Sequence, residues 1–389
     1  MEKTEFIKNL EKRAFSPLGE GFWKCANDSS IINIGTAENR VISDLLLPYL
    51  QNRPEMNESH LIYNGSTIKK PLTSAIAALF RDWMDIKDAR EDQIIMGSGI
   101  SFLIERLGLT LVEPGEIVLI PKPCYGAFEP DLIFCKAKVQ YIELDNLPPC
   151  PPENAKLLIL TNPGNPYGDL IENPEELLKW AYQNPKMHIV TDDVYALTNR
   201  HGKAFHSIAG LSIANPERVH LFYGISKDWG MAGFHVGFFW TRSVDLLQQM
   251  RLACGCYSMG SDTIQILARI FSDIPLRDRI ILESQIRLKH AEEVACRELS
   301  KHGIGFKTFE NSLFIMIDLT NIAGGSEEQE LLVFRTLLNE HKVHVLPGKA
   351  GFRCSQPGWF RLCFSCKDDE LIMGIERLAT GIRAILQNK

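Results

Sequence analysis

The sequence of 389 residues lacks long apolar segments. Its longest apolar runs, such as residues 117–120 and 157–160, have the length of a β-strand and are far too short to cross a bilayer. The first six residues, MEKTEF, carry charges and include no apolar stretch of the kind found in signal peptides. We therefore expect a cytoplasmic protein without a membrane partner.

An excess of positive charge is also absent. Lysine and arginine number 42 against 48 aspartates and glutamates, the formal net charge is −6, and no basic run exceeds a few residues. Binding to nucleic acid needs a basic patch or stripe, so we expect no nucleic-acid partner.

The ten cysteines do not form the pattern of a zinc site. Cys363 and Cys366 form a CxxC motif and Cys254 and Cys256 a close pair, but a zinc site usually needs four ligands in two suitably spaced pairs. Cys363 and Cys366 also lie in a strand-like apolar run. We expect reduced thiols and no bound metal.

What the sequence does contain is an alternation of short apolar strands and helices. We predict strands at residues 94–96, 117–120, 139–142, 157–161, 188–191, 219–223 and 235–240. Such strands, mostly separated by helices, are typical of an α/β protein whose mainly parallel sheet is covered on both faces.

The C-terminal third has a different pattern. A long helical pattern over 265–302 precedes predicted strands at 314–319, 343–346 and 359–365, with helices at 331–339 and 368–387. The chain is too long for one ordinary core, so we expect two domains. The predicted organisation is an N-terminal segment (1–60) that packs with the small domain, a large domain (61–285) and a small α+β domain (286–389).

A lysine stands in an unusual setting within residues 226–237, SKDWGMAGFHVG. Lys227 follows a predicted strand and has small, glycine-rich and apolar neighbours. Burial lowers the pKa of a lysine, and the neutral amine can form a Schiff base with an aldehyde. The cofactor that most often uses such a lysine is pyridoxal 5′-phosphate (PLP). The alternative at this point is a loop lysine with a packing role.

Two glycine-rich turns follow predicted strands. Gly97–Ser101 (GSGIS) opens a helix, where backbone N–H groups and a small hydroxyl can hold a phosphate, although it could be a plain capped turn. Residues 161–168 (TNPGNPYG) contain two Asn-Pro steps, which fix a rigid loop whose amide can point at a ring hydroxyl.

Two charged residues occupy positions that we expect to be buried. Asp192 ends a strand, and a carboxylate there can keep a pyridine nitrogen protonated so that the ring accepts electrons. A buried aspartate is costly unless it has a cationic partner, while the adjacent Asp193 could simply start a helix. Arg361 lies inside an apolar strand and demands a buried anion, for which a substrate α-carboxylate is suited. An internal salt bridge is the alternative.

These motifs, in this order, make the chain similar to fold-type-I PLP enzymes of the class I/II aminotransferase family over nearly its whole length. Within that family it resembles the 1-aminocyclopropane-1-carboxylate (ACC) synthase-like branch. The narrower resemblance rests on residues 21–25 (GFWKC), 35–39 (GTAEN), 121–128 (PKPCYGAF) and 355–364 (SQPGWFRLCF). It implies an aspartate-aminotransferase-like fold, in which a mainly parallel mixed sheet flanked by helices forms a large PLP-binding domain beside a smaller α+β domain.

The resemblance also implies roles for individual residues. Lys227 corresponds to the Schiff-base lysine, which also moves the proton between the substrate α-carbon and the cofactor. Asp192 corresponds to the carboxylate at the pyridine nitrogen. Tyr195 and Asn165 correspond to donors to the ring hydroxyl, and Tyr125 to the aromatic residue that stacks on the ring.

Further positions correspond to the phosphate and substrate sites. Those on the phosphate side are Gly99, Ile100, Ser101, Ser226, His235 and Tyr63, the last matching a tyrosine that reaches the neighbouring subunit. Those on the substrate side are Arg361, Asn165, the Ala37 backbone and Glu38, which matches a residue that selects the side chain. A site shared between subunits implies a homodimer.

The chain departs from the family pattern at two positions of the phosphate site. Where the family has an arginine eight residues after the lysine, this chain has His235, and where a serine usually stands three residues before it, this chain has Gly224. A histidine beside a phosphate tends to be protonated, but it cannot form the two-bonded arginine contact. We therefore predict weaker binding of the phosphate.

Three functions follow as hypotheses. The leading one is an aminotransferase that takes an L-amino acid and a 2-oxo acid acceptor in turn. The second is an elimination of the ACC synthase or C–S lyase type, on S-adenosylmethionine or a cysteine-like substrate, which Glu38 and residues 359–361 favour. The third is a catalytically silent binding protein with this fold, favoured only by the altered phosphate site.

Overall fold

The computed structural model describes residues 4, 7–8, 10–11, 16–52, 56–62, 66–255, 257 and 259–387. The central element of this part of the chain is a seven-stranded sheet with the order β2-β8-β7-β6-β5-β3-β4. The strands are β2 (Ile94–Gly97), β3 (Ile117–Pro121), β4 (Lys138–Ile142), β5 (Ala155–Thr161), β6 (His188–Asp192), β7 (Val219–Gly224) and β8 (Gly237–Thr241). β8 pairs antiparallel with β2 and β7, whereas the remaining neighbours pair in parallel. This is the mainly parallel mixed sheet that the sequence predicts.

The strands are apolar throughout because helices cover both faces of the sheet. In β5, Leu157 and Ile159 belong to one hydrophobic core, and Leu158 and Leu160 belong to the core on the opposite face. Helices α5 (Ile100–Leu111) and α8 (Val244–Cys254), with the short α6 (Phe128–Asp131), cover the first face. Helices α4 (Ser66–Trp83), α7 (Pro174–Ala181) and α9 (Ser261–Ser272) cover the second.

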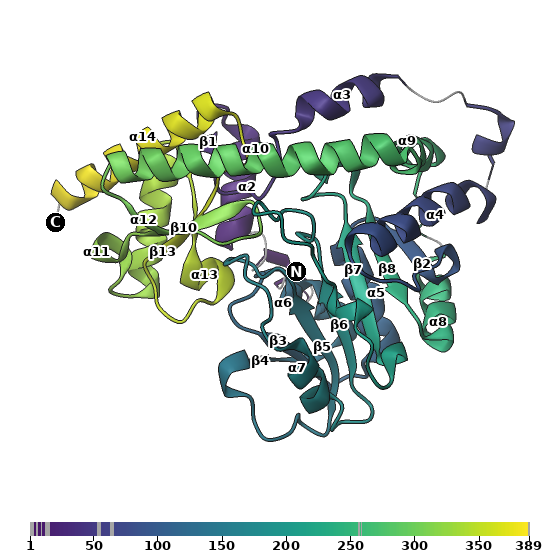
Figure 1. Cartoon of the computed structure of the whole chain (residues 1–389). Helices are drawn as coiled ribbons and strands as arrows, with labels where there is room; N and C mark the ends of the chain where they lie inside the picture. The colour runs from purple at the N-terminus through teal and green to yellow at the C-terminus, as the bar shows by residue number, and fades with distance from the viewer. Residues whose placement is uncertain are drawn as a thin grey trace.

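Helix α10 (Ile274–Lys301) connects the two domains and runs across the top of Figure 1. Its residues Leu276 and Ile280 pack into a core of the large domain, whereas Leu288 and Ala291 pack into the core of the small domain. The boundary that we expected at 285/286 thus falls inside this helix, between its two sets of core residues.

The single helix predicted over 265–302 is two helices. α9 ends at Ser272, and α10 begins after Asp273, whose side chain accepts a hydrogen bond of 3.0 Å from the Leu276 amide. Pro275 occupies the first turn of α10, where its missing N–H costs nothing. The apolar spacing continues through this break, which is why periodicity alone missed it.

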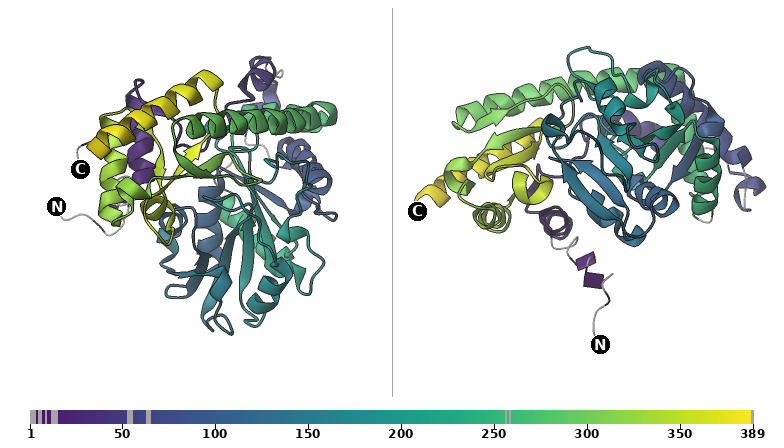
Figure 2. Two further views of the ribbon diagram at one scale, coloured as in Figure 1. Left: turned by 60° about the vertical axis from the view of Figure 1, so that its left-hand side comes forward. Right: turned by 90° about the horizontal axis from the view of Figure 1, so that it is seen from below.

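The small domain contains a four-stranded antiparallel sheet with the order β12-β13-β10-β9. Its strands are β9 (Gly305–Lys307), β10 (Phe314–Asp318), β12 (Leu346–Pro347) and β13 (Trp359–Cys363), and its helices are α11 (Thr320–Ala323), α12 (Glu327–Asn339), α13 (Gly348–Phe352) and α14 (Asp368–Gln387). The two domains lie side by side along α10 in both views of Figure 2.

The N-terminal segment contributes α2 (Pro17–Asn27), β1 (Ile32–Asn33) and α3 (Ser43–Gln51). β1 pairs in parallel with β11 (Val343–His344), and Ile31, Ile32 and Ile34 belong to the small-domain core. The strand predicted at 343–346 is therefore two short strands, β11 and β12, in different sheets.

Short 3-10 turns complete the described structure. They are η1 (Glu58–His60), η2 (Glu91–Gln93), η3 (Ile133–Cys135), η4 (Leu144–Asn146), η5 (Ile208–Gly210), η6 (Pro216–Arg218) and η7 (Ala232–Phe234). His235 ends η7 in the left-handed region with φ of 52° and is not part of a strand, so the strand predicted from residue 235 begins at Gly237 instead. No helix among the described residues is both long and apolar enough to span a membrane.

Candidate active site

A cavity of about 1410 Å³ opens at the carboxyl ends of the parallel strands, between the two domains. This edge is where open α/β sheets bind ligands. The predicted site residues that line it are Ala37, Glu38, Gly99, Ile100, Ser101, Tyr125, Asn165, Asp192, Tyr195, Ser226, Lys227, His235 and Arg361. Tyr63 lies outside the described residues. Within the described residues, no group of three or more His, Cys, Asp or Glu side chains is arranged to hold a metal ion.

Lys227 enters the cavity from the loop after β7. Its Nζ donates a hydrogen bond of 2.7 Å to the backbone carbonyl of Ala37. Burial lowers the pKa of Lys227, and the positive charge of Arg361 lowers it further. The lysine therefore loses its proton more readily than a surface lysine, as a nucleophilic amine requires.

A buried polar network holds the lysine loop in place. The carboxyl of Asp228 accepts hydrogen bonds from the Tyr223 hydroxyl (3.0 Å) and the Leu197 amide (3.2 Å), and Trp229 Nε1 donates to the same hydroxyl at 2.9 Å. Asn39 Nδ2 donates to the Asp228 carbonyl at 3.2 Å. Sequence reasoning missed Asn39 and Asp228, although each is adjacent in sequence to a predicted site residue or motif.

Asp192 stands at the end of β6 and is 6% exposed. Its Oδ1 has no hydrogen-bond partner within the described structure. Burial raises the pKa of this carboxyl to about 7, and the charge of Lys227 opposes the shift. A buried carboxylate oxygen without a donor is unfavourable, so it calls for a cationic or N–H partner from a ligand. A protonated pyridine nitrogen is such a partner.

Asp193 is not among the residues that line the cavity. It is fully buried and accepts hydrogen bonds from the Thr191 hydroxyl and, at 2.5 Å, from the Ser207 hydroxyl. Burial raises the pKa of this carboxyl to about 8. Asp193 is thus a buried residue of the large domain and does not start a helix, since none begins at that position.

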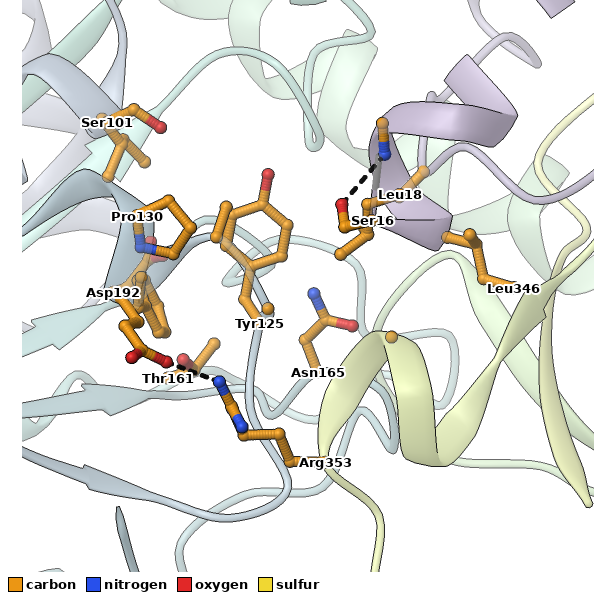
Figure 3. Close-up of a pocket in the computed structure, with 18 of the residues that line it drawn as sticks. Ser16, Leu18, Ser101, Tyr125, Pro130, Thr161, Asn165, Asp192, Leu346 and Arg353 are labelled. Atoms are coloured by element: carbon orange, nitrogen blue, oxygen red, sulfur yellow. Dashed lines mark hydrogen bonds and ion pairs between the residues drawn. The ribbon is translucent and has the colours of Figure 1, made fainter. Parts of the chain in front are cut away.

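Aromatic and amide side chains line the cavity between these charges. Tyr125 and Asn165 enter it together with Asp192 (Figure 3). The Tyr125 ring lies edge-on to Phe128 with ring centres 5.6 Å apart, and the buried Tyr195 lies edge-on to Phe314 at 5.3 Å. Burial raises the pKa of Tyr195 above its ordinary value, so its hydroxyl keeps its proton and can donate a hydrogen bond.

Arg361 is 2% exposed on β13, in the small domain. Its Nη1 donates to Asn165 Oδ1 at 3.0 Å and its Nη2 to the Gly35 carbonyl at 2.7 Å, but its Nε has no partner among the described residues. The guanidinium also lies over the ring of Phe314 at 4.7 Å. The internal salt bridge weighed for Arg361 is not found within the described structure, so the guanidinium remains available to an incoming carboxylate.

Glu38 lies in the cavity beside Lys227, on the segment that also carries Ala37. The Ser365 hydroxyl fixes this segment by donating to the Glu38 carbonyl at 2.7 Å, and the Cys363 thiol lies 3.1 Å from the same hydroxyl. Glu38 is half-buried and lines the same cavity as Lys227 and Arg361.

The rim of the cavity carries a charged cluster that the sequence did not reveal. Arg353 lies at the rim, where it pairs with Glu129 at 2.5 Å and its guanidinium lies 4.2 Å from the ring centre of Tyr141 (Figure 3). No local motif singles out Arg353 in the sequence, because its partners precede it by more than two hundred residues. This pairing leaves Arg361 as the guanidinium deep in the cavity.

A sequence model of the family "Aminotransferase class I and II" matches residues 29–378. The chain belongs to this family. The match covers the N-terminal segment from residue 29 onward, the large sheet and most of the small domain, so it includes every described residue of the predicted site.

Curated relatives place the chain near one branch of the family. It is 28% identical to 1-aminocyclopropane-1-carboxylate synthase 2 of Arabidopsis thaliana over 397 residues, which cover 89% of this chain and 77% of the relative. It is 29% identical to 1-aminocyclopropane-1-carboxylate synthase-like protein 1 of Mus musculus, with 90% of this chain and 76% of the relative covered. The predicted family and branch are therefore confirmed.

Solved structures show the same fold at low sequence identity. N-succinyldiaminopimelate aminotransferase from Mycobacterium tuberculosis has a TM-score of 0.80 at 18% identity, covering 96% of this chain and 99% of that one. A Thermus thermophilus aspartate aminotransferase variant has a TM-score of 0.73 at 17% identity, covering 98% and 97%. The predicted aspartate-aminotransferase-like fold is confirmed.

The protein is thus a PLP-dependent enzyme that acts on amino acids. Three features of the cavity fit the cofactor and substrate: the unsatisfied Asp192 Oδ1, the unsatisfied Arg361 Nε, and a buried lysine whose pKa is lowered. When bound, PLP supplies an electron sink for the electron pair left on the substrate α-carbon after a proton is removed.

Proposed function

We propose that this enzyme transfers the amino group of an L-amino acid to a 2-oxo acid. The observation that carries the proposal is the set of unsatisfied buried atoms around Lys227. Asp192 Oδ1 and Arg361 Nε are buried and lack a partner among the described residues, and both belong to side chains that line the cavity that Lys227 enters. The site thus offers one ring-nitrogen partner, one carboxylate clamp and one proton carrier, which transamination uses in both halves of its cycle.

Each residue has a distinct task in this proposal. Arg361 binds the α-carboxylate through two parallel hydrogen bonds and thereby fixes the α-carbon near Lys227. The lysine amine, whose pKa is lowered by burial, removes the α-proton and later returns it. Asn165 and Tyr195 would donate hydrogen bonds to the cofactor's ring hydroxyl, and Tyr125 would pack on its ring.

The same clamp serves both substrates. An amino acid and a 2-oxo acid share the carboxylate that Arg361 would bind, so the two can use the cavity in turn. Its volume of about 1410 Å³ leaves room for their exchange. The opening between the domains provides the path for product release.

A specific observation favours elimination as a second candidate. Glu38 places a carboxylate in the cavity beside Lys227. That charge would attract a substrate with a positively charged side chain, such as the sulfonium of S-adenosylmethionine. The same α-proton removal would then expel a γ- or β-substituent rather than lead to a keto acid.

One experiment separates these reactions. The protein is loaded with PLP, given one amino acid at a time, and assayed for 2-oxo acid by mass spectrometry, with and without a 2-oxo acid acceptor. Transamination gives about one 2-oxo acid per site and stops until the acceptor is added. Continued turnover of S-adenosylmethionine or cysteine without acceptor would support elimination and contradict our proposal.

Two variants sharpen that test. Glu38→Gln removes the charge while keeping the size of the side chain. It should therefore weaken the binding of a cationic substrate and leave the binding of a neutral amino donor nearly unchanged. Lys227→Ala, at the lysine, serves as the inactive control for both reactions. Failure of the unmodified protein to bind PLP or convert any amino acid would favour a silent binding protein.

We also propose a homodimer in which the partner completes the site. The segment next to Tyr63 exposes apolar side chains, with Leu61 82% and Ile62 67% exposed, and Leu47 on α3 is 51% exposed. Exposed large apolar side chains on these segments are what we expect of a surface that another chain covers. Light scattering should give a mass near twice 44.0 kDa. A mixture of Lys227→Ala and Tyr63→Phe chains should recover activity in heterodimers only if Tyr63 acts on the partner's site.

A further inference from the structure

The first residues of two sequence motifs, GFWKC (21–25) and GTAEN (35–39), pack against one buried side chain. A Cβ built on Gly21 would overlap His344 Nε2, and a Cβ on Gly35 would lie 2.7 Å from His344 Nδ1. The imidazole is 1% exposed, belongs to a residue that lines the cavity, and lies between helix α2 and the turn after β1. Any residue larger than glycine at either position would displace this ring.

The surroundings of His344 fix its protonation state. Its Nδ1 lies 2.9 Å from Asn33 Oδ1, which also accepts hydrogen bonds from the amides of Gly35 (3.2 Å) and Thr36 (3.0 Å). Because backbone amides only donate, the atom of Asn33 that faces them is its oxygen, and Nδ1 of the histidine therefore carries the proton. Burial, reinforced by the charge of Arg361, lowers the pKa of His344 to about 3. The imidazole is thus neutral and is a fixed donor to Asn33.

Asn33 holds the turn after β1 in one shape. Besides accepting from two amides of the turn, its side chain donates from Nδ2 to the Thr36 hydroxyl at 3.0 Å. The backbone is fixed on either side, since the carbonyls of Ile34 and Glu38 each accept a hydrogen bond of 2.7 Å from the segment 363–365 of the small domain. Between these two points, the path of the chain depends on the side chain of Asn33.

Two carbonyls of this turn meet the two cations deep in the cavity. The Gly35 carbonyl accepts a hydrogen bond of 2.7 Å from Arg361 Nη2, and the Ala37 carbonyl accepts one of 2.7 Å from Lys227 Nζ. Arg361 belongs to the small domain and Lys227 to the large domain. The turn therefore sets the position of the proposed carboxylate clamp relative to the amine, and both must reach the same substrate molecule.

We propose that His344 is a positioning residue, which through Asn33 sets the geometry of the carboxylate clamp and the lysine amine. The proposal rests on the roles proposed for Arg361 and Lys227, and it holds for transamination and elimination alike. The Nε2 of His344 faces Gly21 on α2, so the histidine acts through its bond to Asn33 and not as an acid or base. Loss of one such hydrogen bond changes an equilibrium by about three- to tenfold.

Two substitutions separate the hydrogen bond from the packing of the ring. His344→Asn keeps a donor nitrogen bonded to Cγ, where Nδ1 stands, but leaves a gap beside Gly21. His344→Phe keeps a ring between the two glycines but has no donor for Asn33. If the bond positions the site, His344→Asn retains the properties of the unmodified protein and His344→Phe loses them. A histidine with only a packing role gives the opposite order, because the gap in His344→Asn costs packing.

Labelling of Lys227 in the PLP-free protein reports on the turn without any enzymatic reaction. The Ala37 carbonyl stabilises the charged amine, so loss of this bond lowers the pKa of Lys227 and raises the fraction that reacts with an amine reagent. Acetic anhydride is added at limiting concentration, and acetylation is measured by mass spectrometry. We expect Lys227 to be acetylated about three- to tenfold faster in His344→Phe and at an unchanged rate in His344→Asn. Lys203, in an exposed ion pair with Glu310, is the internal control.

Propionate tests the carboxylate clamp in the PLP-loaded protein. It has a carboxylate but no amino group, so it binds without reacting, and its binding is followed by the change in the visible absorbance of lysine-bound PLP. Its dissociation constant should rise about three- to tenfold in His344→Phe and stay unchanged in His344→Asn. The dissociation constant of PLP, measured by equilibrium dialysis, should change in neither variant. KM for an amino donor should follow the propionate constant, with a smaller effect on kcat.

A double substitution tests whether His344 acts through Asn33. Asn33→Ala alone should raise the dissociation constant of propionate, and adding His344→Phe should raise it little further, because the histidine then has no amide oxygen to orient. Circular dichroism and thermal melting confirm that each variant folds. Additive effects of the two substitutions, or a larger loss of propionate affinity in His344→Asn than in His344→Phe, would overturn the proposal.

The measurements also separate this proposal from the proposed function. Acetylation of Lys227 needs neither PLP nor substrate, so it tests the turn even if no amino acid is converted. If acetylation and propionate binding follow the expected order but no 2-oxo acid forms, only the proposed reaction is wrong. If Lys227 is acetylated equally in both variants of His344 while 2-oxo acid forms, only the role of His344 is wrong.

Discussion

The Lys227 amine donates a hydrogen bond of 2.7 Å to the carbonyl of Ala37, a residue 190 positions earlier in the chain. This bond joins the lysine loop of the large domain to the N-terminal segment that packs on the small domain. The neighbouring Asn39 makes a second connection, to the Asp228 carbonyl at 3.2 Å and to the Ser284 hydroxyl at 3.0 Å. The position of the Lys227 amine therefore depends on how the two domains meet.

Lys227→Ala should abolish catalysis while PLP still enters the cavity. A positioned general base contributes about 10²–10⁴-fold to a rate, so kcat should fall by at least about 100-fold. The visible absorbance of lysine-bound cofactor should also disappear. Lys203→Ala is the control, since Lys203 forms an exposed ion pair with Glu310 away from the cavity. Retained absorbance in Lys227→Ala would show that another lysine reacts with the cofactor.

Arg361→Lys should raise KM for every amino acid more than it changes the affinity for PLP. Lysine keeps the charge but loses the planar pair of donors, and hydrogen bonds to charged groups contribute about 1.5–3 kcal/mol, so kcat/KM should fall by about 10- to 100-fold. Steady-state kinetics with several donors measure this effect. The equivalent change at the rim, Arg353→Lys, should have a much smaller effect, and equal losses at both positions would contradict the assignment of Arg361.

Asp193 should make the PLP-free protein less stable as the pH rises. Its folded-state pKa of about 8 lies above the ordinary value of an unfolded aspartate, about 3.9, so the folded state binds the extra proton between these limits. The contribution of Asp193 to the free energy of unfolding is therefore complete below about pH 4. It decreases by up to about 1.4 kcal/mol per pH unit as the pH rises from about 4 to about 8.

Urea unfolding at several pH values between 5 and 8 tests that linkage. Asp193→Asn carries no titratable group at this position, so its free energy of unfolding should change less with pH than that of the unmodified protein. Asp85→Asn is a suitable control, because Asp85 is partly exposed and its pKa is lowered by hydrogen bonds from Lys87 and His206. An unchanged slope in Asp193→Asn would show that Asp193 is ionised in the fold.

Gly230→Ala should destabilise the protein, while Gly233→Ala in the same loop should be tolerated. Gly230 has a φ of 60°, and a Cβ there would lie 2.2 Å from the Asn39 carbonyl oxygen, whereas a Cβ on Gly233 meets nothing within 4 Å. Left-handed strain alone costs about 1–3 kcal/mol, and the contact with backbone adds to it. Thermal unfolding of the two variants side by side measures the difference. Equal melting temperatures would argue against the close packing of residue 39 on the lysine loop.

The strands and the family were predictable because their signals are local. β5 and β7 are continuous apolar runs between turn residues, and the motif around Lys227 indicates the family without help from distant residues. The break between α9 and α10 was not predictable from periodicity, because apolar spacing runs through Asp273. The roles assigned to individual site residues remain predictions, although the fold brings all of them within the described residues to one cavity.

The features that the sequence did not reveal depend on contacts between distant segments. Asn39 bonds to Asp228 in the lysine loop, which is 189 positions away in sequence. Arg353 pairs with Glu129, which is 224 positions away. His235 was predicted to begin a strand, because valine and glycine follow it, yet it ends a turn in the left-handed region. Nothing in the sequence indicates that Ile100 packs close to Gly224.

The pairing of β1 with β11 sets the order in which the enzyme can be completed during synthesis. Asn33 and its partner His344 are 311 positions apart, so the N-terminal segment must wait for nearly the whole chain to leave the ribosome before its strand finds a neighbour. The large sheet has no such requirement, since β2 to β8 all lie between residues 94 and 241. A ribosome-bound chain that ends before residue 343 can form the large sheet but not the Arg361 clamp. If Arg361 binds the substrate carboxylate, as proposed, newly made protein should gain this ability only after the residues up to 361 have left the ribosome.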